Sequence, residues 1–381
     1  MKITRRESLV MGACAAALST VPAIAAGRDS LDGLARAKRL QFGSVIGGGR
    51  PGTLTGSMAD PRYCDLVVRE CGLIVPENEL KWQALRPTPD KFDFARADRI
   101  VAWAKTNRLG IRGHTLLWHH PDWMPRWVAG YDFGANPASK AAAMIQEHVA
   151  TVCKRYRGTI HSYDVVNEAV DNRSGVLRET AFSKAMGAEN VIDLAFRTAK
   201  AEAPDAQLVY NDYMSWEPWN PAHRAGVLRL LEALKKRGTP VDALGVQAHI
   251  GSGNDPGSNG QFGPRDEPAW RRFLDEVTGM GYDLLITEFD VHDKTLPAGI
   301  IARDRAVADY ARAYLDIMLS YQKMRTMMVW GMSDRYSWLQ NRTPRADQLP
   351  KRPCPYDSDF QPKPLRTAIA DALRASPFRE A

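Results

Sequence analysis

Cysteine pairs, low-complexity segments and long apolar runs are missing from this sequence of 381 residues, and each absence excludes a class of protein. The five cysteines include no CxxC pair, so neither a zinc ribbon nor a thioredoxin-type redox motif is supported. If Cys64 and Cys71 share a helix, they lie too far apart along it for a disulfide, which predicts buried free thiols. No apolar run reaches the roughly 20 residues that cross a bilayer, so no membrane span is expected.

Clusters of basic residues are also missing, although the chain carries a formal net charge of +7. The first 26 residues hold three basic side chains and one acidic side chain, which leaves about +5 for the remainder. Because the chain has no basic run and no recognised binding module, nucleic acid is not an expected partner. A mild positive excess suits weak attraction to an acidic polysaccharide.

Residues 1–26 have the order of an export signal: a charged start, a weakly apolar stretch over Leu9–Val21, and small residues before an expected cleavage near Ala25 or Ala26. The adjacent Arg5 and Arg6 are typical of a twin-arginine signal, and an ordinary export signal is the alternative. We therefore expect an exported protein, periplasmic or extracellular, whose mature part is residues 27–381.

Short apolar runs alternate with longer amphipathic stretches along that mature part. The stretches repeat apolar residues at three- and four-residue steps, as Val227, Leu230, Leu231 and Leu234 do, which predicts helices. The runs, which predict strands, are Phe42–Gly47, Gly72–Pro76, Ile111–Leu117, Ile160–Val166, Gln207–Tyr210, Ala243–Ala248, Asp283–Thr287 and Met327–Gly331. Eight strand–helix units predict an α/β fold, a single (β/α)8 TIM barrel with its active site at the C-terminal ends of the strands.

No composition shift or linker marks a second domain. Five internal helices are expected over Lys140–Tyr156, Val191–Ala203, Ala222–Arg237, Ala269–Met280 and Arg303–Gln322, and a last one begins at Pro364. The stretch Gly251–Gly263 is rich in Gly, Ser and Asn and lies between two predicted strands. This composition predicts a long flexible loop near the site.

Polar or aromatic residues follow nearly every predicted strand. They are Glu77, Asn78, His114, Trp118, Asn167, Glu168, Asn211, Asp212, Tyr213, Gln247, His249, Glu288, Asp290, Trp330 and Asp334. Such a ring would be costly inside a core without partners. The sequence therefore predicts a binding site over the mouth of the barrel, where this fold carries its active site.

Two glutamates in this ring have the arrangement that cleavage of a glycosidic bond needs. Glu168 ends the fourth predicted strand and Glu288 the seventh, so the two face each other across the barrel mouth. Glycoside hydrolysis uses two carboxyl groups that flank the anomeric carbon. One protonates the leaving oxygen, and in a retaining enzyme the other attacks the carbon. The pair predicts two-carboxylate chemistry.

Seven separate segments at strand ends resemble glycoside hydrolase family 10, the family of endo-β-1,4-xylanases. They are VPENELKW (75–82), RGHTLLWH (112–119), DVVNEAV (164–170), YNDY (210–213), GVQAHI (245–250), ITEFDV (286–291) and WGMSDRYSW (330–338). The resemblance covers about residues 40 to 372. Any one segment alone would be weak, but seven in the right order make a strong match. The resemblance implies a retaining endo-1,4-β-xylanase that acts on xylan and xylo-oligosaccharides.

The resemblance also implies a role for each of several residues. Glu168 resembles the general acid/base and Glu288 the nucleophile, without a metal or other cofactor. Four supporting residues are implied: Asn167 as a donor to the 2-OH of the sugar at the cleavage point, Gln247 as a partner of the acid/base, His249 as a partner of the nucleophile, and Asp290 as the group that orients that histidine.

Substrate-binding residues are implied on both sides of the cleavage point. Glu77, Asn78 and Lys81 resemble the polar groups that hold the second sugar on the non-reducing side. His114 and Trp118 resemble the floor and wall of the first sugar site, Trp330 and Trp338 an aromatic lid, and Tyr213 a stacking residue beyond the cleavage point. A monomer is expected.

Several alternatives stay open from the sequence. The same family pattern would fit an exo-acting enzyme or one that cleaves mixed xylan and β-glucan, cellobiose-type substrates. A sugar-binding barrel without catalysis is disfavoured because both carboxylates are present. His114, His119 and His120 could be metal ligands, although the chain has no HExxH pattern. Asp164 and Asp334 are expected to orient neighbours.

Overall fold

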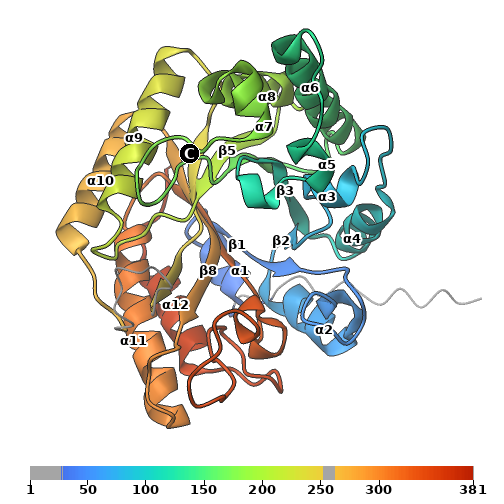
Figure 1. Cartoon of the computed structure of the whole chain (residues 1–381). Coiled ribbons are helices and arrows are strands. Elements are labelled where there is room, and N and C mark those ends of the chain that lie inside the picture. The colour runs from blue at the N-terminus through green and yellow to red at the C-terminus, as the bar shows by residue number, and fades with distance from the viewer. Residues whose placement is uncertain (1–26, 28, 252–261, 381) are drawn as a thin grey trace, which may run out of the picture.

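The strands of the protein close into a barrel surrounded by helices (Figure 1). The structure, a computed structural model, describes residues 27, 29–251 and 262–380; the expected export signal and most of the Gly-rich loop therefore lie outside the described residues. The barrel strands are β1 (Gln41–Ile46), β2 (Leu73–Pro76), β3 (Gly110–Trp118), β4 (Ser162–Asn167), β5 (Gln207–Asp212), β6 (Ala243–Val246), β8 (Asp283–His292) and β9 (Met324–Val329). All are parallel, and the pairing of β6 with β8 closes the ring, which confirms the (β/α)8 TIM barrel.

A longer helix follows each barrel strand and packs outside the ring (Figure 1). These helices are α2 (Pro61–Glu70), α4 (Ala95–Thr106), α6 (Pro137–Arg155), α8 (Ala188–Glu202), α9 (Pro221–Lys236), α10 (Glu267–Gly279), α11 (Ile300–Met318) and α12 (Pro364–Ala375). Each of the five predicted internal helices overlaps one of them and differs at its ends by at most four residues. The apolar spacing that predicted them lies on the face that packs against the strands.

Shorter helices occupy the connections between these units. They are α1 (Leu31–Arg36), α3 (Trp82–Leu85), α5 (Arg126–Ala129), α7 (Ala181–Met186), and the 3-10 helices η1 (Ser57–Ala59), η2 (Pro121–Trp123), η4 (Asp334–Tyr336) and η5 (Trp338–Gln340). Side chains fix where several helices begin: the Asp60 carboxylate accepts from the Arg62 backbone N–H at the start of α2, where Pro61 has no N–H to satisfy.

The seventh barrel strand is longer than the sequence predicts. The expected strand Asp283–Thr287 continues to His292, because its last part pairs with β7 (His249–Gly251), a short ninth strand outside the ring. His249 pairs with Asp290 in this ladder. The prediction that Glu288 follows a strand is therefore wrong: it lies within β8, and backbone pairing holds the residues beyond it.

Apolar side chains fill the space between strands and helices and also the interior of the barrel. A separate interior cluster joins Val45, Leu73, Val75 and Met328 to Trp330, from strands β1, β2 and β9. These residues alternate along their strands with those that face the helices, as the pleat of a strand requires. Trp330 is only 7% exposed. The interior cluster therefore supports the Trp330 side chain, which faces the barrel mouth.

The prediction that the cysteines are free thiols is confirmed. Cys64, Cys71, Cys153 and Cys354 are free thiols; three are buried and Cys64 is half-buried. Core packing also accounts for Trp82, Trp103 and Trp127. Within the described ranges, no helix is long and apolar enough to cross a membrane.

Candidate functional site

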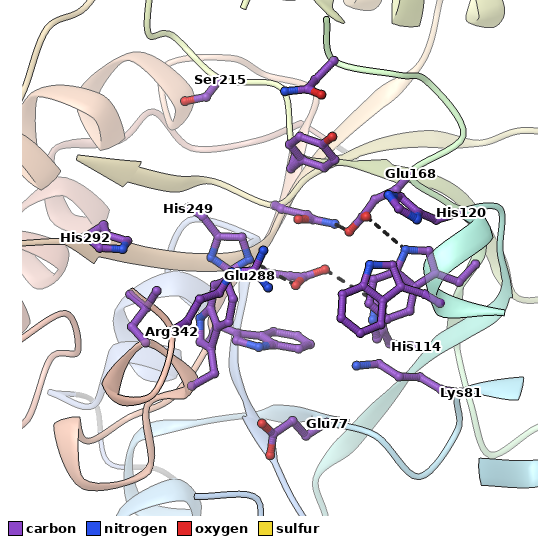
Figure 2. Close-up of a pocket in the computed structure, with 18 of the residues that line it drawn as sticks. Glu77, Lys81, His114, His120, Glu168, Ser215, His249, Glu288, His292 and Arg342 are labelled. Carbon is purple, nitrogen blue, oxygen red and sulfur yellow. Dashed lines mark hydrogen bonds and ion pairs between the residues drawn. The ribbon is translucent and has the colours of Figure 1, made fainter. Parts of the chain in front are cut away.

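A pocket of about 620 Å³ lies over the C-terminal ends of the strands (Figure 2). Twelve of the fourteen predicted site residues line it: Glu77, Asn78, Lys81, His114, Trp118, Glu168, Tyr213, Gln247, His249, Glu288, Trp330 and Trp338. The other two, Asn167 and Asp290, are buried directly behind these residues and hydrogen-bond to them. The structure thus brings the whole predicted set together.

Glu168 is held by an unusual backbone conformation at the end of β4. Its φ of +54° lies in the left-handed region, which a residue with a side chain rarely adopts. Its N–H donates to the carbonyl of Asn211 over 2.9 Å, which fixes this turn. Gln247 Nε2 donates to one carboxyl oxygen over 2.8 Å, and Trp118 Nε1 donates to the other over 3.0 Å (Figure 2). A strained backbone that is held by its surroundings is a feature of functional sites.

Burial raises the pKa of the Glu168 carboxyl above its usual range. The nearby negative charges of Asp212 and Glu288 raise the pKa further, and the hydrogen bonds from Gln247 and Trp118 only partly oppose this. Both donors are neutral, so neither brings the positive charge that would favour a carboxylate further. Glu168 is therefore disposed to carry a proton.

The pKa of Glu288 is shifted in the opposite direction. Burial raises the pKa of its carboxyl, but the hydrogen bond from His249 and the charges of His114 and His249 lower it below the usual range. His249 Nε2 lies 3.3 Å from Oε2, and Asn211 Nδ2 donates to Oε1 over 2.9 Å. His114 Nδ1 lies 4.0 Å from the same oxygen. Glu288 is therefore disposed to be a carboxylate.

A buried aspartate keeps His249 protonated. Asp290 Oδ1 lies 2.9 Å from His249 Nδ1, and Asp290 Oδ2 accepts from Trp338 Nε1 over 2.8 Å. Burial lowers the pKa of His249, but the charge of Asp290 and its hydrogen bond, with those of Glu288, raise it to about 10. At neutral pH both ring nitrogens carry protons, so that His249 donates to both carboxylates at once.

Asn211 links the two halves of the site, although no role was predicted for it. Its Nδ2 donates to Asn167 Oδ1 and to Glu288 Oε1, each over 2.9 Å, and its Oδ1 accepts from Thr287 over 2.7 Å. Asn167 Nδ2 is buried and has no partner within the described residues. A buried amide donor without a partner is costly unless a ligand accepts from it. The sequence signals for Asn211 were its place in the ring of polar residues and in YNDY, and neither indicated these contacts.

Asp164 and Asp334, expected to orient neighbours, are both buried in ion pairs. Asp164 is buried between Arg112, whose Nη2 donates to Oδ1 over 2.6 Å, and His114, whose Nδ1 lies 2.9 Å from Oδ2. This ion pair fixes the ring of His114 at the pocket wall. Asp334 is paired with Lys363 over 2.9 Å.

Lys81 anchors the side of the pocket formed by the β2 connection. Its Nζ donates to Asn78 Oδ1 over 3.0 Å and lies 4.9 Å from the centroid of the Trp118 ring. Burial lowers the pKa of the ammonium, although Glu288 and Glu77 oppose this, and burial raises the pKa of Glu77 to about 7. The group presents polar atoms beside an aromatic face, as sugar binding requires.

The pocket also contains residues that the sequence analysis missed. They are Thr55, Gln83, His120, Trp123, Asn172, Arg173, Ser215, Glu217, Trp219, Asn220, His292, Leu339 and Arg342. Most lie in connections after strands, where nothing in the local sequence shows which side chains turn inward. Trp123 had the clearest signal, because a tryptophan in a Pro-rich connection has no helix face to pack.

Metal binding was an alternative reading of the histidines. Residues 27, 29–251 and 262–380 contain no group of three or more His, Cys, Asp or Glu side chains placed to hold a metal ion. His119 is buried behind the pocket with its Nε2 3.1 Å from the carbonyl of Arg178, so that this nitrogen donates to the backbone. His120 lines the pocket, and its Nδ1 lies 4.0 Å from Asp122 Oδ2.

Comparison with known proteins gives a consistent assignment. The family model for glycosyl hydrolase family 10 matches residues 30–372. The chain is 32% identical to endo-1,4-beta-xylanase 5 of Pyricularia oryzae, over 92% of this chain and 80% of that protein. It is 30% identical to endo-1,4-beta-xylanase B of Thermotoga neapolitana, over 82% of this chain and 83% of that protein.

Solved structures agree. Native xylanase 10B from Thermotoga maritima superposes with a TM-score of 0.77 at 30% identity, over 90% of this chain and 98% of that one. Xylanase 10B from Thermotoga petrophila in complex with xylobiose superposes with a TM-score of 0.77 at 29% identity, over 90% of this chain and 97% of that one. Because the family model matches residues 30–372, the chain belongs to glycosyl hydrolase family 10 and is a glycoside hydrolase.

Proposed function

We propose that the protein is a retaining endo-1,4-β-xylanase in which Glu168 is the general acid/base and Glu288 the nucleophile. The observation that carries this proposal is the opposite disposition of two buried carboxyls in one pocket: the pKa of Glu168 is raised and that of Glu288 is lowered. A pair of titratable groups whose pKa values are pushed apart is how acid and nucleophile are distinguished at one pH.

In the first step the Glu288 carboxylate attacks the anomeric carbon while Glu168 transfers its proton to the leaving glycosidic oxygen. The bond from the carbon to that oxygen breaks, and a glycosyl ester on Glu288 forms. In the second step Glu168, now a carboxylate, accepts a proton from water, whose oxygen attacks the same carbon and releases Glu288. Two inversions retain the β configuration.

The change of role at Glu168 follows from its neighbours. The negative charge of Glu288 contributes to the raised pKa of Glu168 in the free site. Esterification removes that charge, so the pKa of Glu168 falls when it must act as a base. Gln247, a neutral donor at 2.8 Å, can hydrogen-bond Glu168 in both states.

Asn167 and His249 have complementary tasks in this proposal. The unpartnered Nδ2 of Asn167 is available to donate to the 2-OH of the sugar at the cleavage point, a contact that strengthens in the transition state. Protonated His249 holds the Glu288 carboxylate in its ionised form, and Asp290 keeps the histidine charged.

Xylan is the proposed substrate for two reasons. The relatives that match at about 30% identity are named endo-1,4-beta-xylanases, and the T. petrophila structure contains xylobiose. In addition, Trp330 and Lys81 are both almost fully buried at the pocket wall. Side chains packed this closely leave little room for the exocyclic hydroxymethyl of glucose, which xylose lacks.

Proton NMR of the first product tests the mechanism, and a time course on three polymers tests the substrate. Hydrolysis of a xylo-oligosaccharide is expected to release the β-anomer first, and an initial α-anomer would rule out retention. Xylan, cellulose and mixed-linkage glucan are then compared. A ladder of internal xylan fragments supports endo-action on xylan, whereas a single short product or equal rates on glucan favour the exo-acting or mixed alternative.

A further inference from the structure

A corner of the pocket has no part in the proposed reaction. Figure 2 shows His292 and Arg342 on one side of Glu288, with Lys81 and His120 on the other. His292, at the end of β8, and Arg342, after η5, both line the pocket. We call the surface formed by His292, Trp338 and Arg342 the basic corner.

Arg342 is an exposed cation beside an aromatic wall. Its guanidinium carbon lies 5.2 Å from the centroid of the Trp338 ring. Within the part of the chain that the structure describes, no carboxylate lies within ion-pair distance of it, whereas the neighbouring Arg345 and Arg352 are paired with Asp347 and Asp304 over 2.6 Å. The guanidinium donors of Arg342 are thus left for solvent or a ligand.

The backbone beneath Arg342 is fixed by buried cations. Lys351 is 1% exposed, and its ammonium donates to the carbonyl of Leu339 over 2.7 Å and to that of Arg342. Arg345 is 3% exposed and donates to the carbonyls of Asp293 and Leu296. This connection has no regular structure, so these bonds replace the pairing that a strand would provide.

Several cations act on His292 in the basic corner. Burial lowers the pKa of His292 to about 3, and the charges of Lys351, Lys294, His249 and Arg342 add to that effect. His292 is therefore neutral at physiological pH. Its Nε2 lies 3.2 Å from Thr343 Oγ1, and its Nδ1 is buried without a partner in the described residues.

We propose that the basic corner binds a carboxylate on an acidic sugar substituent of the xylan chain, with the Arg342 guanidinium as its ionic partner. A guanidinium presents a planar pair of donors that matches a carboxylate, and packing against Trp338 limits the orientations of that plane. Neutral xylose units carry no anion that would need this cation. This proposal rests on the proposed function, since it specifies which xylans the same site prefers.

The test compares two xylo-oligosaccharides of equal length, one unsubstituted and one with a uronic acid branch. We expect Arg342→Ala to lower the ratio of kcat/KM for the acidic over the neutral substrate about tenfold, the size expected for a lost charge-assisted hydrogen bond. Arg342→Lys keeps the positive charge but lacks the planar pair of donors, and it is expected to restore the kcat/KM ratio only partly. Arg335→Ala is the matched control, because Arg335 is an exposed arginine paired with Asp359 outside the pocket.

A third substrate, whose uronic carboxyl is reduced to an alcohol, separates charge from shape. For the wild type, kcat/KM on this reduced substrate is expected to match that of Arg342→Ala on the acidic substrate. Equal losses on acidic and neutral substrates in Arg342→Ala would overturn the proposal and indicate only a packing role against Trp338. An equal change of the ratio in Arg335→Ala would overturn it as well, in favour of overall charge. Failure of wild type to cleave the neutral oligosaccharide would instead refute the proposed function.

Discussion

The surroundings of Glu168 and of Glu288 differ in the charge of their partners, not in burial. Glu168 is 9% exposed and Glu288 5%, and burial alone raises the pKa of both. Glu168 accepts from two neutral N–H groups, and the like charges of Asp212 and Glu288 act on it. Glu288 accepts from protonated His249. The hydrogen bond from His249, together with the charges of His114 and His249, thus reverses the effect of burial at Glu288.

Removing Glu288, the ionised carboxylate, is expected to have the largest effect on activity. Glu288→Ala deletes the nucleophile, and we expect kcat on xylo-oligosaccharides to fall by more than about 10⁴-fold, as loss of a covalent catalyst does. Binding of xylotriose, measured by calorimetry, should stay within about tenfold of wild type because most contacts with the sugars remain.

Glu217→Ala is a useful control for that experiment, since Glu217 is also buried and lines the pocket but lies away from the proposed reaction. It should lose far less activity than Glu288→Ala. Substantial xylan hydrolysis by Glu288→Ala would show that the ionised carboxylate is not the nucleophile.

Removing Glu168, the protonated carboxyl, is expected to have a smaller effect on activity, and one that depends on the substrate. Glu168→Ala deletes the proton donor, so cleavage of unactivated xylo-oligosaccharides should fall by about 10²- to 10⁴-fold. An aryl xyloside with a good leaving group needs no proton in the first step, and its bond cleavage should be nearly as fast as in wild type. Burst kinetics with such a substrate measure that step. An equal loss on both substrates would contradict the assignment of the acid.

The order of strands and the identity of the polar residues could be predicted from sequence because both depend on local patterns. Apolar runs show the strands, and the polar residues near the end of a run occupy the barrel mouth, which is how Glu168 and Gln247 were found. The exception is β8, predicted to end at Thr287. Its extension depends on β7, and strand pairing with a three-residue partner leaves no mark in the local sequence.

Contacts between connections could not be predicted. Arg342 lies in an irregular segment, and its place beside Trp338 depends on Lys351 and Arg345, which bind carbonyls from beneath. Asn211 was visible as part of YNDY, but its two donors reach Asn167 and Glu288 from different strands. Such roles depend on three-dimensional distance alone.

Changing one partner of each glutamate should move opposite limbs of the pH profile. Glu288 must be ionised, so activity falls as pH falls through its pKa; His249→Ala removes the cation that lowers this pKa, and the acid limb should move to higher pH. Glu168 must be protonated, so activity falls as pH rises through its pKa. Gln247→Leu removes a bond that lowers that pKa, and the alkaline limb should move to higher pH.

Profiles of kcat/KM measure these limbs in the free enzyme. At the optimum, His249→Ala should lose about 10- to 100-fold and Gln247→Leu about tenfold or less, given the strength of charged and neutral hydrogen bonds. His249→Asn, which keeps a neutral donor, is the matched control. An unmoved acid limb in His249→Ala would mean that the charge of His249 does not set the ionisation of Glu288.

Glu217 extends the comparison from activity to stability. It is a buried glutamate whose carboxyl accepts from neutral donors, among them the Gly251 N–H, the Tyr310 O–H and Ser215. Burial raises its pKa to about 7, above the unfolded value, so the native state binds the extra proton and stability falls as pH rises between the two. From about pH 5 to about pH 8, urea unfolding of wild type should lose up to about 3 kcal/mol more than that of Glu217→Gln. Glu288→Gln is not expected to remove this loss, since the pKa of Glu288 is lowered and the group is ionised in both states there; it should change the pH dependence only through Glu168 and His249, on whose pKa values its charge acts. If the pH dependence of Glu217→Gln equals that of wild type, burial without a cation does not raise a pKa in this pocket, and the explanation for Glu168 fails with it.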